Sequence, residues 1–147
     1  MQDYRNILLA TDLSKTSATV AQRARTLAHC LDAKLTLLYV VEGFPEDLPV
    51  KWVAPENEDP KMYLQARATE ELRALAEQAA CPDAALQVVF CDRGPCREIT
   101  RYAKEQGVDL IIMSSRGHQG IKRNLGSKVG TVIDDADCDV LTVHSAE

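Results

Sequence analysis

The sequence predicts an α/β protein built on a parallel, doubly wound sheet with helices on both faces. Short, continuous apolar runs alternate along the chain with segments whose apolar residues recur at helical spacing. Continuous apolar runs are typical of strands buried on both faces, as in parallel sheets. The helices between them then provide right-handed crossover connections. The predicted order of elements is β-α-β-α-β-α-β-α-β.

Two strands and one helix are predicted in the first third of the chain. Ile7–Ala10 and Leu35–Val41 are the apolar runs expected to form the strands. Between them, apolar residues at helical spacing over 20–31 predict an amphipathic helix. Asp12-Leu13-Ser14 follows the first strand and offers side chains that cap helix N-termini, so we expect this segment to cap that helix.

Residues 42–60 differ in kind from the segments on either side. They hold several prolines and acids and the only tryptophan, Trp52, which predicts a mobile loop. Asp59-Pro60 has the pattern of an N-cap followed by proline at the first helical position. The helix that follows carries its apolar residues on one face: Leu64, Ala68, Leu72, Leu75 and Ala79.

Three further strands are predicted at Leu86–Cys91, Leu110–Met113 and Val140–Val143. Gly94-Pro95 begins the helix between the first two of these, and Gly107 suits its C-terminal cap. That helix has Ile99, Tyr102 and Ala103 on one face. The helix before the last strand has Val129, Val132, Ile133 and Ala136.

Length and charge limit the class of protein. At 147 residues we expect one domain over 1–147, with a core of ordinary size. The net charge of −5, from 17 basic and 22 acidic residues, argues against nucleic-acid binding, which depends on neutralising phosphates. No apolar stretch approaches the length of a membrane span, and the polar N-terminus does not resemble a signal peptide.

Five cysteines are present, an odd number with no CxxC spacing. This argues against a disulfide framework and against a metal site, and it favours reduced thiols in a cytoplasm. Cys91 and Cys96 flank a predicted turn and are close in sequence, but buried small apolar side chains are the favoured interpretation.

The segment after the fourth strand predicts a site for an anion. Leu110–Met113 opens into a loop of serines, glycines and basic residues that closes at Gly126-Ser127, where a helix begins. Backbone N–H groups and a helix dipole in this arrangement attract a phosphate. The loop is basic within an acidic protein because it holds Arg116, His118, Lys122 and Arg123. A solvated loop is the alternative, and His118 has no acidic neighbour in sequence that would favour catalysis.

Several stretches support a family resemblance when they are taken together: Asn6–Ser14, Ala33–Val40, Gly94-Pro95 with Glu98-Ile99, Val108–Met113, and Gly126-Ser127 with Cys138–Leu141. In these stretches the chain resembles the universal stress protein family in its short single-domain form. The resemblance implies an adenine-nucleotide-hydrolase-like fold with sheet order 3-2-1-4-5. It also implies a cytoplasmic stress-response protein that forms a homodimer through the last strand, with Val140, Leu141, Thr142 and Val143.

The resemblance further implies a site for ATP or a related adenine nucleotide, with Mg²⁺ accompanying it. Asp12 would lie by the adenine and ribose, and the backbone of Val40 and Val41 would face the adenine. The site would be completed by Met113, Ser114, Gly117, Gly126 and Ser127. Each assignment has an alternative: Asp12 and Ser127 as helix N-caps, and Val40 and Val41 as ordinary strand packing.

Nucleotide-binding members share a pattern of glycine, two residues, glycine, nine residues, glycine, then serine or threonine, and two registers fit it here. Gly117, Gly120 and Gly130-Thr131 match the spacing, but Gly130 would then lie inside a helix. The other register uses Ser114, Gly117 and Gly126-Ser127, which places the last pair at a helix start. It departs from the pattern by a serine for the first glycine, which adds a side chain where backbone approaches the ligand, and by a shorter loop.

The sequence is compatible with three functions. The first is a stress-response module that binds an adenine nucleotide. The second is a ligand-free dimer that acts through protein contacts, with Trp52 and Phe44 as its contact surface. The third is an enzyme, which the sequence disfavours because it lacks a Walker lysine motif and an evident general base, although slow ATP hydrolysis stays open.

Overall fold

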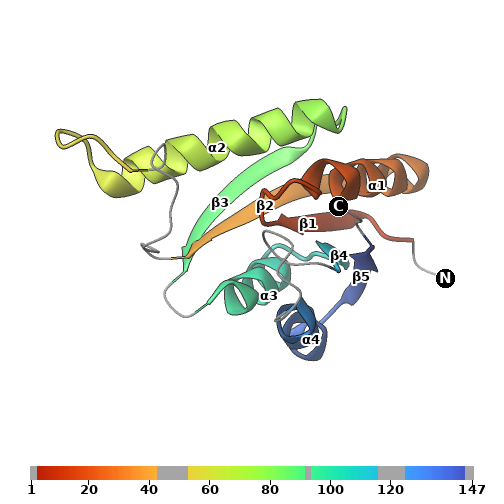
Figure 1. Cartoon of the computed structure of the whole chain (residues 1–147). Helices are drawn as coiled ribbons and strands as arrows, with labels where there is room; N and C mark the ends of the chain where they lie inside the picture. The colour runs from red at the N-terminus through yellow and green to blue at the C-terminus, as the bar shows by residue number, and fades with distance from the viewer. Residues whose placement is uncertain (1–2, 43–52, 92–93, 116–124, 145–147) are drawn as a thin grey trace.

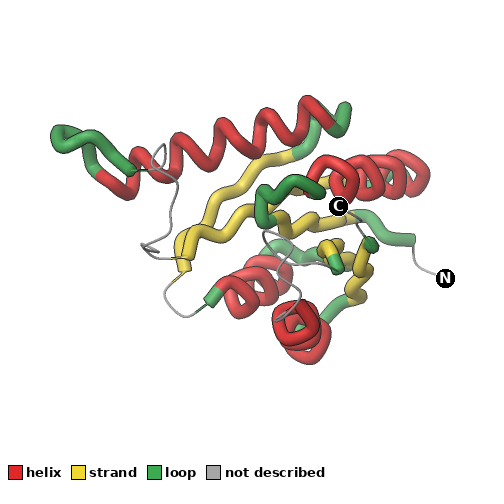
Figure 2. The backbone as a smooth tube through the Cα atoms, viewed as in Figure 1, coloured by secondary structure: helices red, strands yellow, loops and turns green. Residues whose placement is uncertain are grey.

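The computed structural model describes residues 3–42, 53–91, 94–115 and 125–144. Strands and helices alternate through these residues as the sequence predicts (Figure 2). The elements are β1 (Asn6–Thr11), α1 (Ser17–Leu31), β2 (Lys34–Glu42), α2 (Pro60–Gln78), β3 (Ala85–Cys91), α3 (Pro95–Glu105), β4 (Leu110–Ser114), α4 (Leu125–Asp135) and β5 (Asp139–Val143).

The strands form one parallel sheet in the order β3-β2-β1-β4-β5, which confirms the expected topology. Helices α1 and α2 cover one face of the sheet, and α3 and α4 cover the other (Figure 1). Winding reverses between β1 and β4, because the chain moves outward from β1 toward β3 and then returns to β4 on the other side. In open α/β sheets, ligands bind at such a point, beyond the carboxyl ends of the strands.

Two layers of apolar packing hold the helices on the sheet. Successive side chains of a strand point to opposite faces, so Ile7 and Leu9 of β1 pack with α1 and α2. Leu8, between them, packs with α3 and α4. All three are buried, which explains why β1 reads as a continuous apolar run rather than an alternating one.

The predicted start of α2 and the predicted C-terminal cap of α3 are confirmed. Asp59 is the N-cap of α2, where its Oδ1 accepts a hydrogen bond of 3.1 Å from the backbone N–H of Lys61, and Pro60 begins the helix. Gly107 follows α3 in the left-handed conformation with φ of 67°. The next residue, Val108, donates its N–H to the carbonyl of Ala103 at 2.9 Å, so the helix closes as expected at a glycine.

The predicted cap of α1 is wrong. The helix begins at Ser17, and its N-cap is Thr16, which makes no capping hydrogen bond with its side chain. Asp12 lies too far upstream, because the chain first makes a turn between β1 and α1. Asp12 and Ser14 therefore stabilise that turn rather than cap the helix.

Both residues at the limits of the predicted loop over 42–60 belong to regular elements, the second of them as the Asp59-Pro60 pattern predicts. Glu42 is the last residue of β2, and Pro60 is the first residue of α2. Phe44 and Trp52 lie outside the described residues. Among the helices within the described ranges, none has the length and apolar character needed to cross a membrane.

Candidate functional site

The sheet opens between β1 and β4 at its carboxyl edge. The pairing of β1 with β4 ends at Leu9 and Ile112. Beyond those residues β1 continues to Thr11 along β2, and β4 continues to Ser114 along β5. The two strands therefore run on without pairing to each other at the point where the winding reverses. This opening is the candidate site.

Strand β2 extends past the end of β1. Its pairing with β1 stops at Tyr39, whereas its pairing with β3 continues through Val40, Val41 and Glu42. The edge of β2 on the β1 side is thus not paired with β1 beyond Tyr39. The side chains of Val40 and Val41 are buried in the cores on opposite faces of the sheet, so only their backbone groups can serve a ligand.

Asp12 lies just beyond β1 with one carboxylate oxygen held by the turn. Its Oδ1 accepts hydrogen bonds from the backbone N–H of Ser14 at 2.9 Å and from the hydroxyl of Ser17 at 3.3 Å. Both bonds reach the same oxygen. Across the ranges that the structure describes, no bond to Oδ2 is found, so the arrangement leaves that oxygen available for a donor on a ligand.

Leu13, the residue after Asp12, has a left-handed backbone with φ of 57°. That conformation costs a leucine about 1–2 kcal/mol. The side chain is half-buried and packs against two clusters that α2 forms with the sheet, one of which holds Val41 and Leu64. Strained residues of this kind occur where surrounding structure fixes them and are frequent at binding sites.

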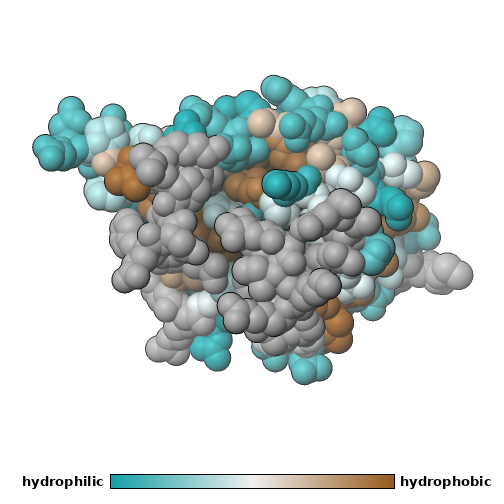
Figure 3. All heavy atoms as spheres, viewed as in Figure 1, coloured by the Kyte–Doolittle hydropathy of each residue, from teal (hydrophilic) through white to brown (hydrophobic). Residues whose placement is uncertain are grey.

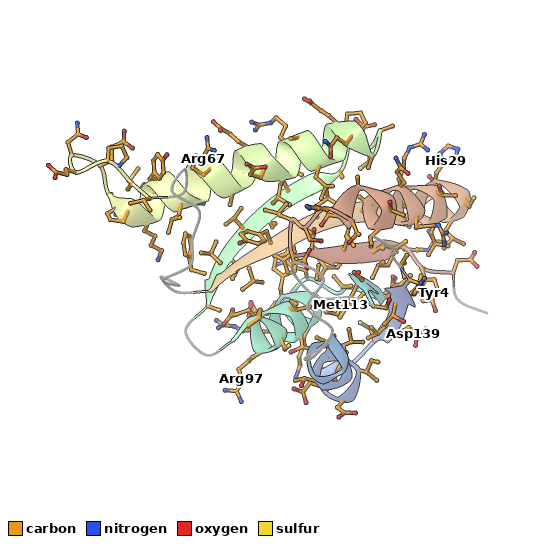
Figure 4. All side chains as sticks on the ribbon, in the orientation of Figure 1. Tyr4, His29, Arg67, Arg97, Met113 and Asp139 are labelled. Atoms are coloured by element: carbon orange, nitrogen blue, oxygen red, sulfur yellow. The ribbon has the colours of Figure 1, made fainter. Side chains whose placement is uncertain are left out.

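The end of β4 supplies the opposite wall. Met113 is on the face covered by α3 and α4, and only 8% of its surface is exposed (Figure 4). A contribution from Met113 would therefore come from its backbone. Ser114 is half-buried and pairs with Val143 of β5, and the N–H of Ser115 donates to the carbonyl of Val143 at 2.8 Å. Pairing with β5 thus holds the backbone of β4 in place as far as Ser114, its last residue.

Helix α4 starts at Leu125, so Gly126 and Ser127 belong to its first turn. An N-cap role for Ser127 is therefore wrong, since the helix begins before it. Gly130 lies inside α4, which confirms the reason for preferring the register that ends at Gly126-Ser127. Because α4 leads from the carboxyl end of β4 to the parallel strand β5, its N-terminus lies at the carboxyl edge of the sheet. Gly117 falls in 116–124, which the structure leaves undescribed.

Two residues that sequence reasoning missed are Thr11 and Ser17. The Thr11 hydroxyl donates to the Ser17 hydroxyl at 3.0 Å, and Ser17 in turn donates to Asp12. A signal was present, because alternation along β1 from Ile7 and Leu9 places Thr11 on the face that α1 covers. The hydrogen bond between Thr11 and Ser17 was not predicted because Asp12 was assigned as a helix cap, which placed the start of α1 too early.

The pKa shifts that the structure resolves arise away from this opening. A hydrogen bond of 2.5 Å from the Tyr4 hydroxyl to Asp139 raises the pKa of Tyr4, and Figure 4 shows this pair at the amino edge of the sheet. Burial raises the pKa of Cys81, of Tyr102 and of Cys138, the last also because acidic residues surround it. All five cysteines are free thiols. Among the described residues, no group of three or more histidines, cysteines and acids is placed to hold a metal.

Comparison with known proteins gives one consistent result. A family model described as the universal stress protein family matches residues 3–144. The chain is 34% identical over 146 residues to universal stress protein A homolog 2 from Coxiella burnetii, covering 98% of this chain and 97% of the relative. It is 30% identical over 147 residues to universal stress protein YxiE from Bacillus subtilis, covering 96% and 99%.

Solved structures agree with the sequence relatives. The chain is similar to universal stress protein UspA from Lactobacillus plantarum with a TM-score of 0.75 and 26% identity, covering 97% of this chain and 99% of the other. It is similar to a universal stress protein in complex with cAMP with a TM-score of 0.71 and 25% identity, covering 99% and 100%.

Proposed function

We propose that this chain, which belongs to the universal stress protein family of stress-response proteins, binds an adenine nucleotide in the opening between β1 and β4. The observation that carries the proposal is the divergence of these strands beyond Leu9 and Ile112, where Asp12 and the first turn of α4 follow. The cAMP complex among the similar structures supports adenine nucleotides as the class of ligand. The family model over 3–144 supports one domain for the whole chain.

Charge sets the orientation of the proposed ligand. The Asp12 carboxylate repels phosphates and accepts hydrogen bonds from hydroxyl groups, so it faces the ribose. The first turn of α4, with Gly126 and Ser127, attracts the phosphates through unpaired N–H groups and the helix dipole. At the other end of the proposed site, the extended edge of β2 at Val40 and Val41 offers backbone groups to the adenine.

Met113 and Ser114 at the end of β4 line the site between the adenine and the phosphates. Gly117 belongs to the segment that leads from β4 to α4.

The residues described at the opening suit nucleotide binding better than dedicated catalysis. Asp12 is engaged through Oδ1 with the backbone of Ser14 and the hydroxyl of Ser17, so it is held in place by the turn. A Mg²⁺ ion would accompany ATP through its phosphates, since that ion is usually held by substrate phosphates and water rather than by a protein cage. We place this binding module in the cytoplasm, where its five free cysteines stay reduced.

The first experiment is the release of bound small molecules from freshly purified protein by denaturation, followed by mass spectrometry. We expect an adenine nucleotide, and calorimetric titration of the stripped protein should then show one site for ATP with Mg²⁺. GTP serves as the control, because its base differs at the positions that the β2 backbone would read. If neither release nor titration detects a nucleotide at millimolar ATP, the ligand-free alternative, based on Ser114 and the short loop, replaces this proposal.

We also propose a homodimer through β5. Within the part of the chain that the structure describes, this strand is at the end of the sheet and pairs only with β4. Exposed edges are usually covered or paired. Leu141 on β5 is 41% exposed and Ile133 on α4 is 52% exposed. Figure 3 shows apolar surface at the side of the molecule where α4 and β5 lie. Val140, Thr142 and Val143 continue this edge.

Sedimentation of a Leu141→Lys variant tests the dimer. We expect the natural protein to sediment as a dimer and the variant as a monomer, because paired edges would bring two lysines together in an apolar contact. Met62→Lys, at an exposed position on α2, is the matched control and should remain dimeric. A dimer that survives Leu141→Lys would place the contact elsewhere.

A further inference from the structure

A chain of hydrogen bonds links the end of β1 to the start of α1 and ends on Asp12. The backbone N–H of Leu13 donates to Thr11 Oγ1 at 3.1 Å. The Thr11 hydroxyl donates to Ser17 Oγ at 3.0 Å, and the Ser17 hydroxyl donates to Asp12 Oδ1 at 3.3 Å. Each hydroxyl thus accepts one bond and donates the next, so all donors point toward the carboxylate.

The two hydroxyls are fixed by regular elements rather than by a loop. Thr11 is the last residue of β1 and is paired with Tyr39 of β2. Ser17 is the first residue of α1, and only 6% of its surface is exposed. Water therefore has little access to compete for the bond from Ser17 to Asp12. Side chains anchored in this way hold their partners in one geometry, which preorganises a binding group.

The turn itself supports the same geometry. Leu13 has a left-handed backbone that Thr11 stabilises through the Leu13 N–H. Ser14 donates its N–H to the same Asp12 oxygen that Ser17 binds. Oδ1 consequently has two donors from the protein. The bonds fix the plane of the carboxylate and leave Oδ2 for a donor from outside the turn.

We propose that Thr11 and Ser17 are positioning residues that orient Asp12 so that Oδ2 accepts a hydrogen bond from a sugar hydroxyl of the bound nucleotide. Neither residue touches the ligand in this scheme. The inference rests on the proposed nucleotide site. It adds that the bond to Asp12 Oδ2 lets the site distinguish a ribose from a sugar without these hydroxyls. The carboxylate must keep this orientation for the selectivity, because a rotated carboxylate would exchange the ligand bond for water.

A purely structural role for the same bonds predicts a different result. If Thr11 and Ser17 only join β1 to α1, their loss weakens the fold and lowers affinity for every nucleotide alike. If they position Asp12, their loss lowers affinity only for ligands that carry sugar hydroxyls. The ratio of affinities for ATP and for 2′,3′-dideoxy-ATP therefore separates the two roles.

Thr11→Val and Ser17→Ala are the test variants, because each removes one hydroxyl of the chain and the first keeps the shape of the side chain. Thr11→Ser keeps the hydroxyl and should restore selectivity. Thr26→Val is the matched control, since the Thr26 hydroxyl bonds the carbonyl of Gln22 within α1, away from Asp12. Thermal melting of each variant checks that it is folded.

Titration with both nucleotides in the presence of Mg²⁺ gives the ratio. For the natural protein, Thr11→Ser and Thr26→Val we expect ATP to bind about tenfold more tightly than the dideoxy compound, as a bond to a charged acceptor provides. In Thr11→Val and Ser17→Ala the ratio should fall to about twofold, with unchanged affinity for the dideoxy compound.

Three results would overturn the inference, and each is distinguishable from the others. An unchanged ratio in both folded test variants, or equal weakening of both ligands, excludes positioning while the nucleotide site stands. Equal affinity of the natural protein for both nucleotides means that Asp12 does not read the sugar, and again only the inference fails. Binding of neither nucleotide by the natural protein removes the proposed function and the inference together.

Discussion

Replacing Ser127 with aspartate should weaken ATP binding roughly 10- to 100-fold without harming the fold, because it places a like charge beside the phosphates. Ser127 is in the first turn of α4. An acidic residue there interacts favourably with the helix dipole, by about 0.3–1 kcal/mol, so the helix should be as stable as before or more so. Stability and binding thus move in opposite directions, which a general disturbance of the structure would not produce.

The controls for this variant separate charge from position. Ser127→Ala removes the hydroxyl without adding charge, and we expect ATP affinity to change only a few-fold. Gln65→Glu adds the same charge on the exposed surface of α2 and should leave binding unchanged. Calorimetric titration and thermal melting measure the two effects. ATP affinity that is retained in Ser127→Asp would mean that the phosphates do not lie at the start of α4.

The strands could be predicted from sequence because burial on both faces leaves a simple signal. Leu110–Met113 is a continuous apolar run, and the structure buries all of it. The order of the strands has no such signal, because it depends on contacts between distant segments. It came from the family resemblance, and the parallel pairing of β1 with both β2 and β4 confirms it. A helix start could also be predicted where one capping side chain determines it, as at Asp59, the N-cap of α2.

The β1–α1 turn shows where local reasoning stops. An aspartate after a strand has the same short-range pattern whether it caps a helix or bonds the N–H two residues on, as Asp12 does with Ser14. What decides between them is the conformation of Leu13, with φ of 57°. A leucine gives no warning of a left-handed backbone, because that conformation is held by tertiary packing rather than by its own preference.

The candidate site was only partly predictable for a related reason. Sequence patterns placed Asp12 and Ser114 after strands, and parallel topology brings such positions to one edge. The opening itself depends on register: β1 and β4 pair only as far as Leu9 and Ile112, although each continues beyond. Register follows from packing on both faces of the sheet, so the residue at which the pairing of β1 with β4 ends could not be read from the sequence alone.

Ile112→Ala should cost about 2–5 kcal/mol in the free energy of unfolding, the largest effect on stability that we expect from one truncation. Ile112 is fully buried and lies in β4 between Leu9 of β1 and Leu141 of β5. Its side chain belongs to the core beneath α1 and α2. Truncation removes apolar contacts and leaves a cavity that neighbouring strands cannot close, because both are held by backbone pairing.

Met62→Ala is the control, since it truncates an apolar side chain on α2 that is 69% exposed and lies outside the proposed dimer edge. It should change stability by no more than about 0.5 kcal/mol. Denaturant unfolding at one protein concentration measures both variants, so that any dimer contributes equally. Because Ile112 also marks the last β1–β4 pair, its truncation should loosen the opening and weaken ATP binding. Similar losses of stability in both variants would contradict a core centred on β4.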